Sequence, residues 1–342
     1  MLLQGARRCG AQGTDERREC VLERKRPTPS EIERSAHLAM ILRPRPHWLH
    51  LLFVRRGSLL QRIVSQQLFI FSISVLVVVF HGQLFHWKVT LTSGPFSLMG
   101  VALAIFLGFR INASYDRYWE ARKHWGAILV ETRNLARKAL TTIGPPDLVR
   151  PFVLGLAGFA ATVRNHLRDE SAAYGTTGLL PNTLCTDMAD ARYPHQRVLL
   201  WLGEWLRERR ISGELNPLLA PSFEDSLDAL SMACGSCERI ASTPLPFTYS
   251  VILHRSAYLY CMLLPFGLVD AIGAMTPLVV TFVAYTFFAL EALSDEIEDP
   301  FGKAPNDLAL DAMVISIEGS LRELLGDTPP PVPVPDENFV LT

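Results

Sequence analysis

The pair Cys234-Gly-Ser-Cys237 is the part of this sequence whose residue types and spacing come nearest to a reactive site. A CxxC pair can be a redox centre or half of a four-ligand zinc site. No second CxxC and no HxxxH accompanies it, and the nine histidines form no cluster along the sequence. We therefore expect the two cysteines to be small packing residues on one face of a helix.

Motifs for other kinds of chemistry are also missing from the sequence. It has no GxSxG nucleophile elbow and no GxxxxGK[ST] phosphate loop, so we expect neither an enzyme nor a cofactor. The acidic run from Asp295 to Asp299 offers hard oxygen ligands for calcium, but its spacing is not that of an EF-hand loop. Ordinary charge at the end of a helix explains this run better.

The balance of apolar and charged residues indicates a chain divided between lipid and water. Of the 342 residues, 49% are hydrophobic and 20% are charged, and the mean hydropathy is +0.19. The formal net charge of −1 leaves no surplus of cations to neutralise phosphates, so we expect no nucleic-acid partner.

Four stretches are apolar enough and long enough to cross a bilayer as helices, which takes about 20 residues each. The sequence predicts these spans at residues 66–87, 95–113, 246–269 and 271–291. Only a short break separates the last two spans, which should form a tight helical hairpin. Arg and Lys gather before the first span and after the second. By the positive-inside rule, both termini of this multi-pass protein should lie on the cytoplasmic side of a bacterial inner membrane.

The long segment between the second and third spans is not a simple loop. Apolar residues recur at helical spacing through residues 114–245, with breakers at Gly144-Pro145-Pro146 and at Asn216-Pro217. We predict cytoplasmic helices there and at residues 292–326. The expected fold class is therefore an all-α membrane protein with four transmembrane helices and a helical cytoplasmic bundle.

The two ends of the chain differ from its middle. Residues 1–39 are rich in charge and contain no apolar run, so we expect a disordered extension. Residues 328–342 are rich in proline and should be extended. The remaining residues, 40–327, should form one domain.

An apolar stripe marks the second span. Val101, Ile105 and Phe109 follow one another at i, i+4 and i+8, which places them on one face of a helix. Such a stripe can face lipid or pack in a core. It can also form a hydrophobic constriction that gates a pore by dewetting. The spacing itself is compatible with all of these interpretations.

The helix of the second span should continue where its charges begin. No proline or glycine pair interrupts GVALAIFLGFRINASYDRYWEARKHWG, so one helix should run from the membrane into the cytoplasm. Its lower part carries Asp116 and Glu120. They are either solvated charges, with Arg117 pairing to Glu120 at i+3, or acidic rings that face a pore.

Four segments together resemble the bestrophin family, in particular its bacterial branch. They are RPRPHWLHLLFVRRGS before the first span, GVALAIFLGFRINASYDRYWEAR in the second, CERIASTPLPFTYSVILHR entering the third and LSDEIEDPFGKAPNDLALDAM after the fourth. Their order along the chain extends the resemblance over about residues 40–342.

The resemblance implies a homopentameric ion channel in which the second span of each subunit surrounds a central pore. The positions that match the neck of that pore are Val101, Ile105 and Phe109. The position that matches a second, cytoplasmic aperture is Leu218. Where animal members carry an acidic calcium clasp, only Asp299 and Asp307 remain as ligands, so we expect no metal site.

The same resemblance favours chloride-type anions as the permeant ions, with the lipid bilayer and further copies of the chain as partners. An apolar neck selects neither sign of charge, and acidic pore residues would favour cations. A monovalent-cation channel of the same fold therefore stays open as an alternative. A secondary transporter is another, and it would need helices broken near the membrane midplane, for which Pro265 and Pro277 are the candidates.

Overall fold

A computed structural model of the chain describes residues 59–80, 83–84, 87–88, 93–304, 306–332 and 334. The predicted disordered extension, residues 1–39, lies outside the described residues, as does the end of the proline-rich tail. The described start of that tail is neither helix nor strand. It lies against the last helix, because a Cβ on Gly319 would stand 3.7 Å from Pro329 and 3.8 Å from Pro330.

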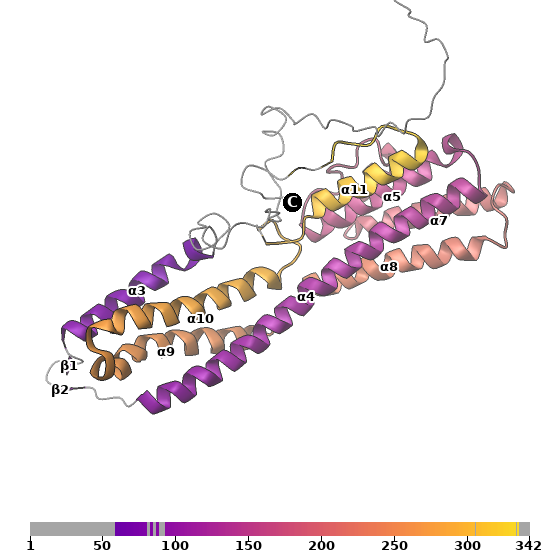
Figure 1. Cartoon of the computed structure of the whole chain (residues 1–342). Helices are drawn as coiled ribbons and strands as arrows, with labels where there is room; N and C mark the ends of the chain where they lie inside the picture. Colours follow the sequence, from indigo (N-terminus) through magenta and orange to yellow (C-terminus); the bar gives the residue numbers. More distant parts are fainter. Residues whose placement is uncertain are drawn as a thin grey trace, which may run out of the picture.

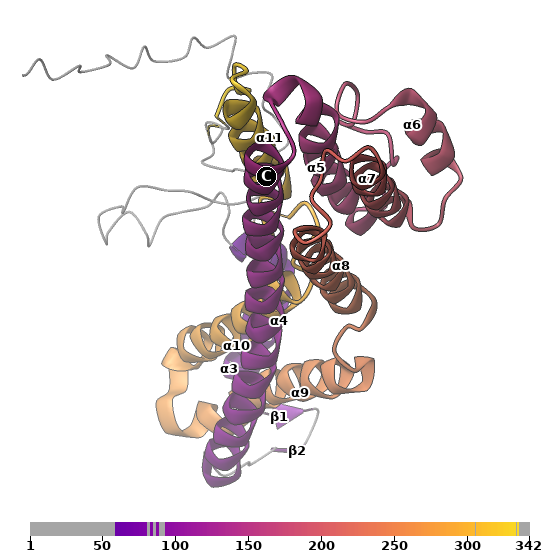
Figure 2. The same cartoon turned by 90° about the vertical axis from the view of Figure 1, so that its right-hand side faces the viewer.

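One long helix, α4 (Ser93–Thr142), runs through both halves of the molecule (Figures 1 and 2). Its 50 residues extend about 75 Å at 1.5 Å per residue, more than twice the roughly 30 Å of a bilayer's hydrocarbon core. The prediction that one helix continues past Phe109 and Arg110 is confirmed. The charges in its middle mark a change of surroundings and do not end the helix.

The first half of α4 packs with three other helices in what we call the apolar lobe. These are α3 (Leu60–Val79), α9 (Phe247–Ile272) and α10 (Thr276–Glu298). A single 3₁₀ turn, η2 (Gly273–Met275), joins α9 to α10, and Gly273 begins it at a φ of +54° that favours glycine. The predicted tight helical hairpin is therefore confirmed.

The prediction for the first span was wrong about its helix, which begins earlier and ends earlier than residues 66–87. Phe80 closes α3, where its N–H bonds to the carbonyls of Leu76 and Val78. Beyond it, β1 (Gln83–Leu84) and β2 (Trp87–Lys88) pair as a short antiparallel hairpin. A run without charge does not have to be helical, and here its last residues form the hairpin.

The second half of α4 belongs to what we call the helical bundle (Figures 1 and 2). Its other members are α5 (Pro146–Leu167), α6 (Asn182–Ala189), α7 (Pro194–Ile211), α8 (Ala220–Ser242) and α11 (Leu310–Leu325). The predicted breakers at residues 144–146 and 216–217 fall at helix boundaries, with Pro146 as the first residue of α5.

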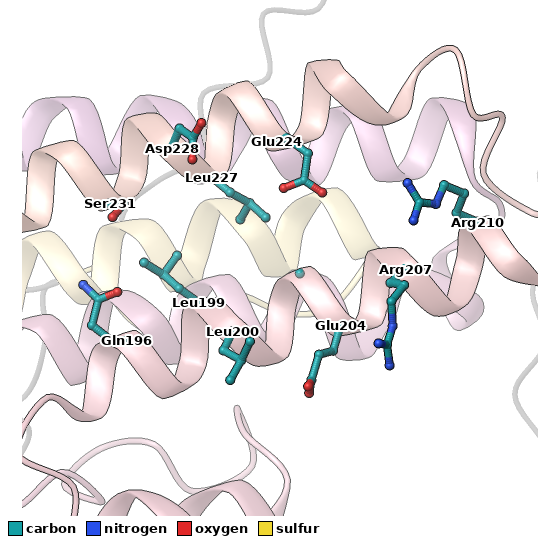
Figure 3. A pocket seen from close by; sticks show the side chains of 11 residues that line it. Gln196, Leu199, Leu200, Glu204, Arg207, Arg210, Glu224, Leu227, Asp228 and Ser231 are labelled. Atoms are coloured by element: carbon teal, nitrogen blue, oxygen red, sulfur yellow. The ribbon is translucent and has the colours of Figure 1, made fainter.

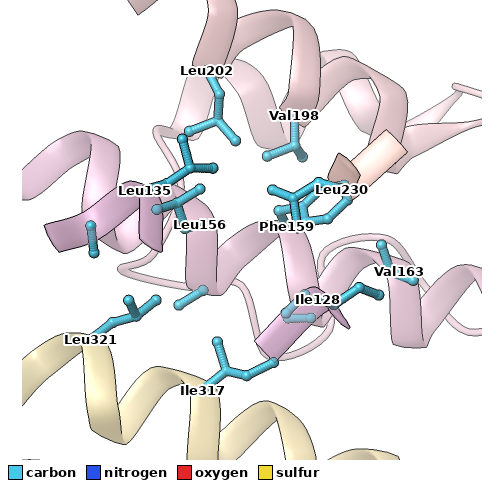
Figure 4. Packing of buried hydrophobic residues seen from close by; sticks show 14 of the residues in the cluster. Ile128, Leu135, Leu156, Phe159, Val163, Val198, Leu202, Leu230, Ile317 and Leu321 are labelled. Carbon is cyan, nitrogen blue, oxygen red and sulfur yellow. The ribbon is translucent and has the colours of Figure 1, made fainter. Parts of the chain in front are cut away.

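The centre of the bundle is α5, in which residues 155–165 are buried without a break and so are covered on every side. Its side chains interdigitate with those of α4, α7, α8 and α11 (Figure 4). The labelled core residues are Ile128, Leu135, Leu156, Phe159, Val163, Val198, Leu202, Leu230, Ile317 and Leu321. Cys234 and Cys237 are buried in this core as free thiols, which confirms their packing role. Burial raises the pKa of Cys237 to about 12.

Four helical stretches of the described chain are long and apolar enough to cross a membrane. They are α3, α4, α5 and the α9–α10 hairpin taken as one. In α5, 67% of the apolar window is buried, against 17% to 28% in the other three. The apolar surface of α5 is therefore buried in the bundle core. The helices whose apolar surface is available to lipid are those of the apolar lobe.

Candidate functional site

The stripe on α4 lies on a face that the rest of the described chain leaves uncovered. Val101, Ile105 and Phe109 are 59%, 51% and 60% exposed. The opposite face carries Leu103 and Leu107, which are buried against α9 and α10. The stripe is therefore available to lipid or to other copies of the chain, and core packing within one chain does not explain it.

Two of the charges below the stripe have different surroundings. Asp116 is exposed and continues the uncovered face of α4. Glu120 instead forms an ion pair with Arg239 of α8 at 2.5 Å, and its carboxylate also lies 3.6 Å from His124 Nε2. Of the two acidic residues that we considered for a pore, only Asp116 is free of an ion pair among the described contacts.

Arg117 does not form, among the described contacts, the i+3 pair with Glu120 that one interpretation of the sequence allowed. The Arg117 guanidinium donates to the carbonyls of Ile240 and Thr243 at the end of α8, and to that of Glu298 at the end of α10. Helix C-termini have unpaired carbonyls and a partial negative charge, which a cation stabilises. Arg117 thus ties the ends of two helices to α4, and i+3 spacing could not reveal partners so distant in sequence.

A second arginine, Arg110, joins α4 to the end of α10 at the boundary of the apolar lobe. Arg110 is buried, and its guanidinium bonds Asp295 Oδ1 at 2.5 Å and lies 3.6 Å from Glu298. Arg62 of α3 lies 4.0 Å from Asp295 and 3.7 Å from Glu296. The acidic run after the fourth span is therefore helix-end charge with arginine partners. An arginine directly after an apolar run is the sequence signal for this junction.

Leu218 lies at the far end of α4 from the stripe. Its side chain is 86% exposed. It lies in a turn in which the Leu218 N–H donates to Asn216 Oδ1 at 3.0 Å. The start of α8 packs beside the end of α4, where Lys138 Nζ donates to the carbonyl of Ser222 at 2.5 Å. The structure therefore places the neck residues and Leu218 near opposite ends of one helix.

Asp299 and Asp307 converge around Gly302, where a Cβ would stand 2.5 Å from Asp307 Oδ2 and 3.6 Å from Asp299 Oδ2. Asp307 is buried and accepts a hydrogen bond from Ala304 N–H at 2.6 Å. Burial, reinforced by Asp299 and Glu296, raises the pKa of Asp307 to about 7. Within the described ranges, these two carboxylates have no third ligand close enough to make a metal-binding group.

An open groove of about 570 Å³ lies between α7 and α8 (Figure 3). Leu199, Leu200 and Leu227 form its apolar part, and Arg207 and Arg210 lie toward one end. It is far from the stripe on α4, and it offers a surface for contact rather than a catalytic set.

Neither proline proposed as a helix break acts as one. Pro265 lies inside α9, which continues to Ile272, and Pro277 lies in the first turn of α10, where proline is tolerated. Among the described helices, the apolar lobe therefore lacks the broken pair that a transporter site would use.

Comparison with known proteins agrees with this architecture. The sequence matches the family model described as bacterial/fungal bestrophin protein over residues 40–323. It is 45% identical over 295 residues to the voltage-dependent anion channel-forming protein RSc3414 of Ralstonia nicotianae, covering 84% of this chain and 95% of that one. It is 41% identical over 304 residues to YneE of Escherichia coli K12, a protein with the same descriptive name, covering 89% of this chain and 100% of that one.

A solved structure has the same fold. The bacterial bestrophin homologue from Klebsiella pneumoniae superposes with a TM-score of 0.75 at 38% sequence identity, covering 78% of this chain and 100% of that chain. The residues matched by the family model, 40–323, include the helices that carry both the stripe and the junction. The chain is therefore a membrane protein that belongs to the bacterial and fungal bestrophin family.

Proposed function

We propose that five copies of this chain form a channel in which α4 of each copy lines a central pore for small anions such as chloride. The observation that carries the proposal is the exposed apolar stripe of Val101, Ile105 and Phe109, opposite a face that packs inside the chain. Apolar side chains that face one axis from several copies form a constriction that gates by dewetting.

The length of α4 supports a pore more than a lipid contact. The helix continues well beyond the thickness of a bilayer, and its uncovered face becomes polar at Asp116. Ser222, four residues after Leu218, accepts a hydrogen bond from Lys138, which lies about 44 Å along the helix from Phe109 at 1.5 Å per residue. A pore lined by α4 would therefore meet a neck at one end and an aperture at the other.

The ion is proposed from the relatives and from charge. The proteins RSc3414 and YneE are named as anion channel-forming proteins, which supports an anion. Exposed Asp116 supports a monovalent cation in its place if this carboxylate faces the pore. A secondary transporter has less support, because α9 continues through Pro265.

We further propose that the channel lies in a bacterial inner membrane with both termini in the cytoplasm, because Arg and Lys gather on that side of the spans. Its partners would be the lipid bilayer and four further copies, and its role would be conduction without enzymatic activity. Exposed apolar side chains on α3 and α10, such as Leu68, Phe69 and Phe282, suit contact with lipid.

Reversal potentials of the purified protein in planar bilayers under a KCl gradient test the proposal. We expect unitary currents that reverse near the chloride equilibrium potential. Reversal near the potassium potential would establish the cation alternative, and strictly coupled flux without unitary currents would establish a transporter. Native mass spectrometry of the detergent-solubilised protein tests the number of subunits.

The neck has a matched control on the same helix. Phe109→Ala and Ile105→Ala should each raise the unitary conductance, because they widen the constriction. Phe106→Ala should leave it unchanged, since Phe106 is similarly exposed, at 52%, but lies off the stripe. Unchanged conductance in both stripe variants would remove Val101, Ile105 and Phe109 from the pore.

A further inference from the structure

Three side chains of the helical bundle that the proposed pore does not use converge from separate helices. His166 is in the last turn of α5, His195 in the first turn of α7 and Glu238 in the last turns of α8. Their ligand atoms all lie within 4.8 Å of one another. Because α5, α7 and α8 pack on one another (Figure 2), the fold itself sets this convergence.

The buried atoms of this cluster form no aligned hydrogen bond within the described chain. His195 is 0% exposed, yet neither of its ring nitrogens has a hydrogen-bond partner among the described residues. Glu238 Oε1 is buried as well and accepts no hydrogen bond from them. Buried polar groups in native folds are nearly always satisfied, so atoms that approach one another without an aligned hydrogen bond suit a bound ion between them.

The spacing of the three groups suits a metal ion. Glu238 Oε1 lies 3.1 Å from His166 Nε2 and 3.2 Å from His195 Nε2. In a tetrahedral zinc site with Zn–N bonds of about 2.0–2.1 Å, neighbouring ligand atoms stand roughly 3.3 Å apart. Two of the three spacings therefore match such a site already.

We propose that His166, His195 and Glu238 bind a divalent transition-metal ion such as Zn²⁺, with water as a fourth ligand. Two imidazole nitrogens and one carboxylate oxygen suit zinc and its neighbours, whereas calcium takes about six to eight oxygens. The side chains of His166 and Glu238 are 25% and 27% exposed, which leaves one side open to water and to an entering ion.

A bound ion would join α5, α7 and α8 where they meet α4. Glu238 directly precedes Arg239, whose guanidinium pairs with Glu120 of α4 at 2.5 Å. An ion that binds the folded bundle and not the unfolded chain raises the stability of the bundle. The metal site does not depend on ion conduction. A negative result for metal binding would therefore leave the proposed channel function intact, and the reverse also holds.

Titration of Zn²⁺ into the full chain tests the site. The protein is purified in detergent, stripped with a chelator and followed by calorimetry and by thermal melting. We expect about one Zn²⁺ bound per chain and a higher Tm with Zn²⁺. Ca²⁺ at the same concentration should not compete, and equal competition by Ca²⁺ would overturn the proposed ligand set.

Variants locate the binding. His166→Gln and Glu238→Gln should each weaken Zn²⁺ binding by at least about ten-fold and remove the rise in Tm. Both side chains are partly exposed, so these variants should fold even where His195→Gln does not. His124→Gln is the matched control, because His124 is also 25% exposed and lies 3.6 Å from a carboxylate but belongs to no three-ligand group of the described chain. Wild-type affinity in the first two variants, or equal loss in the control, would overturn the site.

Discussion

The first half of α4 and the whole of α5 are both apolar enough to cross a membrane, yet they have opposite surroundings. In α5, almost every apolar side chain is covered by four neighbouring helices. In α4, one apolar face packs against α9 and α10 while the stripe of Val101, Ile105 and Phe109 is uncovered. The difference lies in what surrounds each helix and not in its composition.

This contrast separates stability from function. An apolar side chain that is covered within the chain contributes to the free energy of folding, because it is removed from water. An apolar side chain that the chain leaves uncovered is available to lipid, to other subunits or to a pore. Substitutions in the two helices should therefore change different measurements.

The largest expected effect is the loss of a buried ring in α5. Phe159→Ala should lower the free energy of unfolding by about 3–5 kcal/mol, because it leaves a cavity in the bundle core. Phe109→Ala removes the same ring from an exposed position of α4 and should change stability by less than about 0.5 kcal/mol. Thermal melting of both variants in detergent measures the difference, and similar losses in both would remove the contrast between the two helices.

A smaller effect, dependent on pH, is expected where α10 leads into the bundle. The folded-state pKa of Asp307 is about 7, above its unfolded value of 3.8. The folded chain therefore holds this proton more tightly, and the stability that it contributes is present at low pH and is lost as pH rises through 7. Between pH 5 and pH 7 the loss should amount to about 2–3 kcal/mol, since each pH unit contributes about 1.4 kcal/mol.

Asp307→Asn tests this pH dependence, because an amide cannot ionise but can still accept the hydrogen bond from Ala304 N–H. Melting temperatures of wild type and variant should diverge from pH 5 to pH 8, with the variant higher at pH 8. Asp299→Asn, which removes a neighbouring charge, should move the midpoint of the divergence to lower pH. Parallel melting curves across this range would contradict the assignment.

Much of the architecture could be predicted because it depends on local patterns. The absence of breakers predicted one continuous α4, and the apolar runs predicted the α9–α10 hairpin. The end of α3 could not be predicted, since Phe80 and the hairpin after it carry no charge that marks a boundary. Charge reports the surroundings of a segment, whereas hydrogen bonding decides where its helix ends.

The candidate sites were harder to predict than the fold. The helical period of the stripe on α4 is visible in the sequence. That its side chains are exposed could be seen only in the structure. The partners of Arg117 and the cluster of His166, His195 and Glu238 come from helices far apart along the chain. No spacing rule connects such residues, because only tertiary packing brings them together.

The smallest expected effect concerns the junction between the apolar lobe and the bundle, where a buried and an exposed arginine face one carboxylate. Asp295→Asn should lower the free energy of unfolding by about 1–2 kcal/mol, because among the described residues it leaves buried Arg110 with Glu298, 3.6 Å away, as its one remaining ion-pair partner. Arg62→Gln should cost less than about 0.5 kcal/mol, since Arg62 is exposed and 4.0 Å from the same carboxylate. Combining the two substitutions in a thermal-melting cycle separates the pairs. If Arg62→Gln proved the costlier change, the surface pair would hold the junction, and α4 would be fixed to α10 by something other than its buried arginine.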